Sequence, residues 1–323
     1  MRYLTLYLAA MQLCGALTGS AQRIVRHDPR FDRLMPSAAV VQKLAEGDWL
    51  EGPVWNRPEG FLLFSDIPTN SIFKWQDGKG VSLFLRPSGY AGSTRFEGPH
   101  PGSNGLAYDA QGRLVLCDEG NRRVARLNAD GTKTTLAARY LGKRLNSPND
   151  LAIKSNGDLY FTDPYFSGPR RELDFCGVYR LTPRQKLTLL TRELNTPNGI
   201  AFSPDEKTLY IANSDPSRPV WMAFEVSPVG TLSNGRVFFD ATAWTKTKLG
   251  LPDGLKVDKG GNLFATGPGG LHVFTPDGSH LGSIEFDRLL VTNCAWGGDG
   301  SVLYITANIA LYRVKTATQG AGW

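Results

Sequence analysis

Short apolar runs recur along the chain in pairs, and a polar turn containing glycine separates the two runs of most pairs. Six such pairs occur. Each begins with a polar residue, here called its opening residue, and the six opening residues are Glu51, Asn104, Asn149, Asn198, Asp253 and Asn293. The second runs are Phe61–Ser65, Leu114–Cys117, Leu159–Thr162, Leu209–Ala212, Leu263–Thr266 and Leu303–Thr306. Runs of this length bounded by turn-forming residues are typical of β-strands.

The spacing within the six copies is nearly constant. The second run closes 14 or 15 positions after the opening residue, and consecutive opening residues lie 40 to 55 residues apart. A third run and a turn follow, as in Val124–Leu127 before Asn-Ala-Asp-Gly, and Asp-Gly favours hairpins. Four-stranded propeller blades need roughly 40 to 50 residues. The pattern therefore predicts an all-β, six-bladed β-propeller. A long β-sandwich or two stacked barrels remain the alternatives, but neither explains a register fixed across six copies.

The N-terminus has the features of an export signal. Arg2 precedes the mostly apolar stretch Tyr3–Leu17, and small residues end at Ala21. That stretch is shorter than the ~20 apolar residues of a membrane-spanning helix. We therefore expect residues 1–21 to be a cleavable signal and the protein to be periplasmic or secreted in a bacterium. An uncleaved anchor or an unstructured start is the alternative.

The rest of the chain divides into three parts. We expect residues 22–48 to form an N-terminal arm whose outer strand closes the ring with the C-terminal unit. Residues 49–316 would form the propeller, with a metal site in its central channel, and residues 317–323 a C-terminal tail.

Charge and cysteine content exclude several classes of function. The net charge is +6 without any cluster of Lys and Arg, so nucleic-acid binding has no local support. The mature chain would keep Cys117, Cys176 and Cys294. An odd number without regular spacing argues against a disulfide framework and predicts scattered, buried thiols.

The opening residues predict a metal site. The innermost strands of a propeller surround one axis, so their opening residues should lie at one height in the channel. All six side chains end in oxygen, and two of them, Glu51 and Asp253, are carboxylates. Oxygen ligands suit Ca²⁺, with Mg²⁺ and Mn²⁺ as alternatives, and Zn²⁺ a weaker one because the ring lacks His and Cys. The competing interpretation is that Asn-Gly and Asp-Gly only form turns, which does not explain Glu51.

The positions of several further polar residues also suggest roles for them, and two of these residues have two interpretations. Asp150 either reaches the channel or caps a loop. His100 closes the loop segment Arg95-Phe-Glu-Gly-Pro, which either contacts substrate or faces solvent. His272 lies in an apolar run and is expected to be a packed strand histidine. Three aspartates at the ends of second runs are expected to bond neighbouring backbone at the far rim; they are Asp66, Asp118 and Asp163.

Several motifs resemble those of the senescence-marker-protein, gluconolactonase and luciferin-regenerating-enzyme family. They are Glu51-Gly-Pro-Val-Trp, Ser147-Pro-Asn-Asp-Leu, Phe161-Thr-Asp-Pro, Thr196-Pro-Asn-Gly-Ile-Ala-Phe and Leu251-Pro-Asp-Gly-Leu. The segment from Ala265 to Gly278 is similar to the family's bacterial gluconolactonase branch. The resemblance covers residues 40 to 315 and implies a six-bladed propeller that uses one divalent cation to hydrolyse sugar-type lactones.

The resemblance also implies roles for individual residues. The metal ligands would be Glu51, Asn149, Asn198 and Asp253, with Asp253 also the general base. We expect the substrate to contact Asn104, Asp150, Asn293 and His100. Ser147 departs from the family's animal members, which carry Arg there, so their sugar specificity does not transfer.

These observations predict water attack on a lactone carbonyl, assisted by the cation and Asp253. The sequence contains no Gly-x-Ser-x-Gly segment, so a covalent acyl-enzyme is not expected. Two alternatives are a phosphotriesterase-like hydrolase on the same metal and a non-catalytic ligand-binding propeller with structural calcium. The partner is a small-molecule lactone, with no membrane contact in the mature form, and the protein would be a monomer or dimer.

Overall fold

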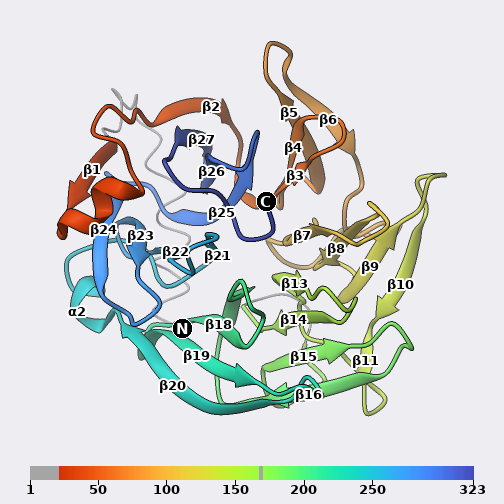
Figure 1. Cartoon of the computed structure of the whole chain (residues 1–323). Helices are drawn as coiled ribbons and strands as arrows, with labels where there is room; N and C mark the ends of the chain where they lie inside the picture. Colours follow the sequence, from red (N-terminus) through yellow and green to blue (C-terminus); the bar gives the residue numbers. More distant parts are fainter. Residues whose placement is uncertain (1–21, 167–169) are drawn as a thin grey trace.

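Six antiparallel sheets surround a central axis in the computed structural model, which describes residues 22–166 and 170–323 (Figure 1). Each sheet corresponds to one copy of the sequence repeat, so the predicted six-bladed β-propeller is confirmed. The expected signal, residues 1–21, lies outside the described residues. The first three blades contain the strands β3 (Leu50–Asn56), β4 (Phe61–Asp66), β5 (Ser71–Gln76) and β6 (Gly80–Leu85), then β7 (Leu106–Tyr108), β8 (Leu114–Asp118), β9 (Arg123–Leu127) and β10 (Lys133–Ala137), then β13 (Leu151–Ile153), β14 (Leu159–Asp163), β15 (Gly177–Leu181) and β16 (Leu187–Thr191).

The other three blades repeat the same order. Their strands are β17 (Pro197–Phe202), β18 (Thr208–Asp215), β19 (Arg218–Val226) and β20 (Leu232–Asp240), then β21 (Leu255–Val257), β22 (Leu263–Gly267), β23 (Gly270–Phe274) and β24 (His280–Phe286), then β25 (Val291–Gly297), β26 (Val302–Ala307) and β27 (Ala310–Lys315). A ribbon of β11 (Arg139–Tyr140) and β12 (Lys143–Arg144) projects after blade two. The described helices are short: η1 (Pro29–Arg33) and α2 (Thr242–Thr245). None is long and apolar enough to cross a membrane.

The N-terminal residues complete the last two blades. Strand β2 (Gln42–Glu46) pairs antiparallel with β27 and becomes the outermost strand of blade six. Strand β1 (Gln22–Arg26) adds a fifth strand to blade five by pairing with β24. The expected closure of the ring by the N-terminal arm is therefore found, with a second strand that the repeat did not predict.

Apolar side chains fill the spaces between neighbouring blades. The described core divides into six clusters, and each cluster takes its residues from two adjacent blades. Between blades two and three, for example, Cys117 packs with Phe161 and Tyr179. Because every blade buries both faces, its strands read as short continuous apolar runs. All three described cysteines are buried and free, as expected.

Hydroxyl groups of second strands join neighbouring blades near the axis. Thr162 of β14 donates to the carbonyl oxygen of Asn198 in blade four at 2.8 Å, and its oxygen accepts the N–H of Asp150 at 3.1 Å. Ser65 of β4 donates to the carbonyl of Asn104 in blade two at 2.7 Å. These bonds fix the height of one opening residue relative to the next.

We expect Thr162→Val to destabilise the protein by about 2–3 kcal/mol, because it leaves a buried carbonyl and a buried N–H without a partner. Chemical denaturation measures the free energy of unfolding. Thr188→Val, on the outer strand of the same blade, is the matched control and should change it by less than about 0.5 kcal/mol. Equal effects of the two substitutions would contradict a special role for the inner hydroxyl.

The aspartates that end second strands lie beside the opening residues, so the predicted position at the far rim is wrong. Antiparallel pairing brings the end of β4 back to the start of β3, and Asp66 is opposite Leu50. Asp66 accepts the N–H groups of Asp48 and Trp49. Asp163 accepts those of Asn146 and Ser147 at 2.9 and 2.7 Å. The expected bonds to neighbouring backbone are present, as is the bond from the Asn121 N–H to Asp118 at 3.2 Å.

The C-terminal tail, 317–323, crosses the other end of the inner strands. Gly320 forms a β-bridge with Asp258, just after β21. The Arg57 guanidinium, just after β3, donates to the Gly322 carbonyl at 2.7 Å and lies 3.6 Å from the Trp323 ring centroid. The tail thus links blades one and five on the face opposite the opening residues.

Candidate active site

The six opening residues meet at one end of the channel, as the repeat predicts. Five of them are at most 5% exposed: Glu51, Asn104, Asn149, Asn198 and Asn293. Asp253 keeps some exposure to the channel, although its Oδ1 atom is fully buried. Their common height follows from the inter-blade hydrogen bonds and from the equal spacing of the repeat.

Hydrogen bonds of the opening residues run within a blade, to the next blade and, in one case, across the channel to the opposite blade. The side-chain amide of Asn293 in blade six donates to Glu51 Oε2 at 3.3 Å and to Asp150 Oδ2 at 3.4 Å. The Asn198 amide donates to Ser214 Oγ at 3.0 Å. Asp150 therefore faces the channel, and its other oxygen also accepts the N–H of Leu151 at 2.8 Å. The interpretation that Asp150 reaches the channel is the one that these contacts support.

Glycines after the opening residues are needed for close packing around the axis. A Cβ on Gly105 would lie 2.7 Å from Asp150 Oδ1, and a Cβ on Gly254 would overlap the Asn293 side chain. Neither glycine has a positive φ. The Asn-Gly and Asp-Gly pairs at these positions therefore serve the approach of neighbouring blades, and the interpretation as simple turns does not explain them.

Three carboxylates crowd the channel, and we call Glu51, Asp150 and Asp253 the carboxylate ring. Burial raises the pKa of Glu51 to about 8, and the charges of Asp150 and Glu119 add to this effect. Burial also raises the pKa of Asp253 well above its usual range, followed by the charges of Glu51 and Asp150. Lys256 Nζ lies 3.9 Å from Asp150 Oδ2. The ring is thus electrostatically strained when all its members are ionised.

The carboxylate ring and its amides fit a hard divalent cation. Asp253 Oδ1 and Asn104 Oδ1 are buried without a hydrogen-bond partner. All the converging donors are oxygens, and a cation would neutralise the repulsion among the carboxylates. Within residues 22–166 and 170–323, no three His, Cys, Asp or Glu side chains form a metal site by themselves. A cation here would therefore need the asparagine oxygens, as the sequence predicts.

A buried carboxylate that the sequence prediction missed, Glu119, lies beside the ring. It is 3% exposed and follows strand β8. Glu119 Oε1 is 2.9 Å from His100 Nδ1 and accepts the Ser147 hydroxyl at 2.8 Å. Glu119 Oε2 lies 3.4 Å from the Asn104 amide nitrogen. The structure therefore brings His100 to the site through a residue outside the ring of opening residues.

One sequence signal could have identified Glu119. It occupies the position directly after a closing residue of the repeat. The other five copies have at this position Ile67, Pro164, Ser214, Pro268 and Asn308. Only one of the six copies has an ionisable side chain at this position, so the propeller fold itself does not require one there.

His272 is a packed strand residue, as expected. It is fully buried in blade five, with Nδ1 2.8 Å from Ser283 Oγ and Nε2 3.1 Å from the Pro268 carbonyl oxygen. Burial lowers the pKa of His272 to about 3, and the neighbouring His280 adds to this effect. It contributes no ligand to the channel.

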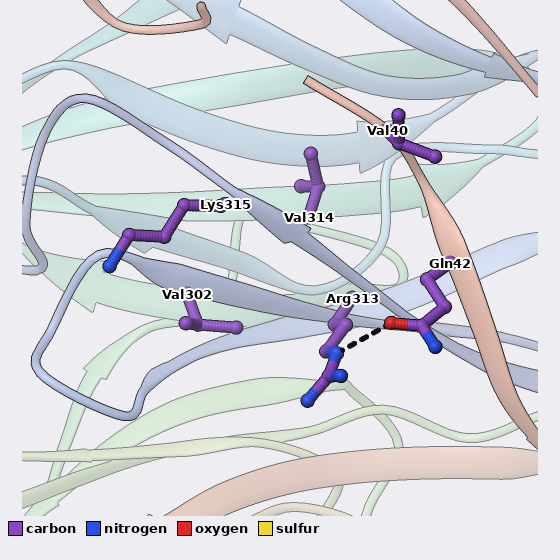
Figure 2. Close-up of a pocket in the computed structure, with 6 residues that line it drawn as sticks. All are labelled: Val40, Gln42, Val302, Arg313, Val314 and Lys315. Carbon is purple, nitrogen blue, oxygen red and sulfur yellow. Dashed lines mark hydrogen bonds between the residues drawn. The ribbon is translucent and has the colours of Figure 1, made fainter. Parts of the chain in front are cut away.

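A hollow on the outer edge of blade six is separate from the channel (Figure 2). Its volume is about 300 Å³, and it is lined by Val40, Gln42, Val302, Arg313, Val314 and Lys315. Arg313 Nε donates to Gln42 Oε1 across it at 2.9 Å. The lining combines valines and basic groups without an acid or a nucleophile, so it does not supply the groups of a hydrolytic site.

Comparisons of the sequence with known proteins agree on one protein family. The sequence profile of the SMP-30/Gluconolactonase/LRE-like region matches residues 49–309. The chain is 36% identical to a gluconolactonase of Zymomonas mobilis over 341 residues, covering 97% of this chain and 95% of that protein. It is 26% identical to regucalcin of Xenopus laevis over 265 residues, 80% of this chain and 82% of that protein.

A solved structure agrees with these sequence matches. The gluconolactonase of Xanthomonas campestris superposes with a TM-score of 0.81 at 31% identity, covering 94% of this chain and 99% of that chain. The region that the family model matches, residues 49–309, includes every opening residue and Glu119. The protein belongs to the SMP-30/gluconolactonase/LRE-like family.

Proposed function

We propose that the protein is a lactonase that opens sugar-type lactones such as gluconolactone with the help of one divalent cation. The observation that carries this proposal is the carboxylate ring, in which buried carboxylates and amide oxygens converge at the open end of the channel. Gluconolactonases among the relatives support the substrate class.

The residues proposed to hold the cation are Glu51, Asn149, Asn198 and Asp253. We assign Ca²⁺ because all four donors are oxygens, with Zn²⁺, Mn²⁺ and Mg²⁺ as outcomes of the test. A bound divalent cation supplies Lewis acidity, which stabilises the negative charge that develops on the lactone carbonyl oxygen.

Asp253 is the proposed general base. Burial and the charges of Glu51 and Asp150 raise the pKa of Asp253 in the metal-free fold. A bound cation would keep this carboxylate ionised, which is the form that can accept a proton. It removes a proton from the water that adds to the carbonyl carbon, and the ring C–O bond breaks when the resulting tetrahedral adduct collapses. The proposed substrate contacts are Asn104, Asp150, Asn293 and His100. The buried amides of Asn104 and Asn293 can each bond a sugar hydroxyl or the lactone oxygens.

A lactone panel with chelation tests this proposal. The protein is treated with EDTA, and hydrolysis of aldonolactones is measured after adding Ca²⁺, Zn²⁺, Mn²⁺ or Mg²⁺ singly. We expect activity to disappear on chelation and Ca²⁺ to restore it best. Faster turnover of phosphotriesters than of lactones would instead assign the phosphotriesterase alternative. Cation binding without turnover of any ester or lactone would assign a non-catalytic binding propeller.

The cellular location is a separate proposal. We propose that residues 1–21 are a cleavable export signal and that the mature protein is periplasmic or secreted, as a monomer or dimer. Fractionation of expressing cells, with the mass of the mature chain, tests both the location and cleavage before Gln22. A protein retained with its first 21 residues in the cytoplasm would contradict it.

A further inference from the structure

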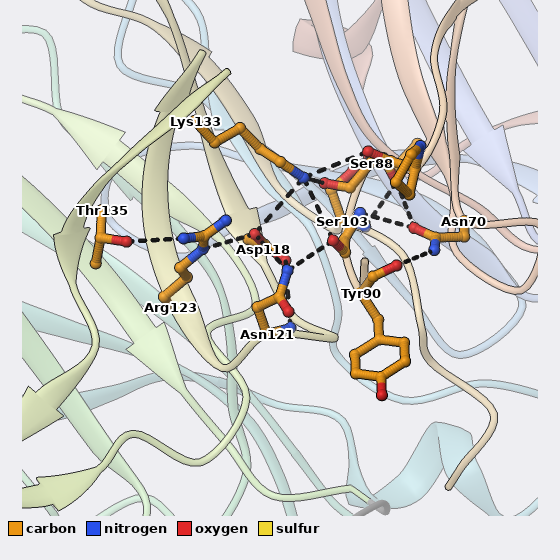
Figure 3. A network of polar contacts seen from close by, with 12 residues as sticks. Asn70, Ser88, Tyr90, Ser103, Asp118, Asn121, Arg123, Lys133 and Thr135 are labelled. Carbon is orange, nitrogen blue, oxygen red and sulfur yellow. Dashed lines mark hydrogen bonds and ion pairs between the residues drawn. The ribbon is translucent and has the colours of Figure 1, made fainter. Parts of the chain in front are cut away.

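A fixed loop carries His100 to the mouth of the channel. The loop spans residues 86–105, between β6 and β7, and polar side chains of blades one and two hold its backbone (Figure 3). Lys133 Nζ donates to the Ser88 carbonyl at 2.5 Å, and the Asn121 amide donates to the Gly89 carbonyl at 2.6 Å. The backbone next to His100 is tied to this anchored part, because the Pro101 carbonyl accepts the Tyr90 N–H at 2.6 Å. His100 is therefore a positioned group although it lies outside the repeat.

Glu119 fixes the His100 ring itself. It contacts Nδ1 at 2.9 Å, so Nε2 is the ring nitrogen left to meet a substrate. The carboxylate is buried and also held by the Ser147 hydroxyl and the Asn104 amide. A buried carboxylate on one imidazole nitrogen sets the tautomer and stabilises the protonated ring.

His100 and Asp253 lie on opposite sides of the channel. Glu119 follows β8 of blade two, and His100 lies on the loop that leads into that blade. Asp253 opens blade five, and blades two and five face each other in a ring of six. A lactone bound between them would have a proton acceptor on one side and a proton donor on the other. Water attack and departure of the ring oxygen need these two functions.

We propose that His100, positioned by Glu119, is the general acid that protonates the ring oxygen as the lactone opens. Water adds to the carbonyl carbon and gives one proton to Asp253. The bond between that carbon and the ring oxygen breaks, and the departing alkoxide takes the proton from His100 Nε2. The product is a hydroxy acid, and solvent returns a proton to His100 and removes one from Asp253. This role rests on the proposed lactonase function.

The electrostatics of the site support a protonated His100. Burial lowers the pKa of His100, but the charge and hydrogen bond of Glu119 and the charge of Glu51 together outweigh burial, and the pKa is raised overall. The charged groups that face it are Glu119 after β8 and Glu51 in β3. A general acid must carry its proton, so activity falls as the pH rises through the pKa of His100.

Two lactones with leaving groups of different basicity test the proposal directly. Gluconolactone loses an alkoxide, whereas dihydrocoumarin loses a phenolate, a much weaker base that departs without a proton donor. We expect His100→Gln to lower kcat for gluconolactone by about 10²-fold or more and to leave dihydrocoumarin hydrolysis within about five-fold of the wild-type value. Equal losses on both substrates, or a rise in KM alone, would overturn the proposal.

A pH profile on gluconolactone alone gives a second readout. Wild-type kcat should fall at alkaline pH, and His100→Gln should abolish that fall. Glu119→Gln should move the fall to lower pH, because the pKa of His100 decreases without the carboxylate. An alkaline fall that is unchanged in both variants would contradict the acid role. If wild-type protein opens neither lactone, the proposed function itself fails.

Glu97→Gln is the matched control, since Glu97 is exposed on the same loop. It should leave kcat, KM and the pH profile unchanged. Thermal unfolding and Ca²⁺ binding of all three variants should match the wild type, which separates loss of an acid from loss of the site.

Discussion

Replacing Asp253 by Asn should lower kcat/KM for gluconolactone by about 10³-fold while the propeller stays folded. The amide has nearly the same shape as the carboxylate and keeps an oxygen for a cation, but it cannot accept a proton from water. Steady-state kinetics with Ca²⁺ present measure the loss. Since the substitution also removes charge from a crowded carboxylate ring, thermal stability in the absence of metal should stay level or rise.

Asp77→Asn is the control for this variant. Asp77 is exposed on the outer edge of blade one and pairs with Arg313 at 3.3 Å. Such surface pairs contribute little, so both activity and stability should be unchanged. Retention of full activity by Asp253→Asn would exclude Asp253 as the base, whatever the cation does.

Removing the cation should make stability strongly dependent on pH. The pKa of Glu51 in the metal-free fold is about 8, against an ordinary value of 4.5. Its contribution to stability is therefore fully present below about pH 4.5 and is lost as the pH rises through about 8. Asp253 acts in the same direction. We expect the Tm of chelated protein to fall by roughly 5–10 °C between pH 5 and pH 8.

A bound cation should oppose this loss, because it stabilises the ionised carboxylates. Calcium should raise the Tm strongly at pH 8 and weakly at pH 5. Asp163, whose pKa burial raises to about 7, contributes equally with and without metal, so the difference between the two curves isolates the site. Glu51→Gln should remove most of this difference. Parallel curves for chelated and calcium-loaded protein would refute a cation at the carboxylate ring.

The fold could be predicted from the sequence because every blade packs apolar side chains against a neighbouring blade on each of its two faces. Apolar runs recur at one spacing since each blade buries both of its faces, and the opening residues then align around the axis without further information. The pairing of β1 with β24 was not predictable in this way, because Gln22–Arg26 has no counterpart in the other blades.

The site was only partly predictable for a related reason. Glu51, Asn198 and Asp253 occupy repeat positions, so their convergence follows from the register. Glu119 and His100 are held together by one contact between a strand end and a long loop, and no periodicity predicts such a contact. The predicted position of Asp163 at the far rim was wrong, because antiparallel pairing brings the end of β14 back to the start of β13.

Strands from the N-terminal end of the chain complete the sheets of the last two blades, so the propeller can form fully only late in synthesis. Blades five and six contain residues 255–315, yet each takes its outermost strand from residues 22–46. The N-terminal strands therefore remain without their partner strands until the ribosome has synthesised nearly the whole chain. An incomplete polypeptide leaves sheet edges that can pair with other molecules, so premature termination should yield aggregates instead of smaller propellers.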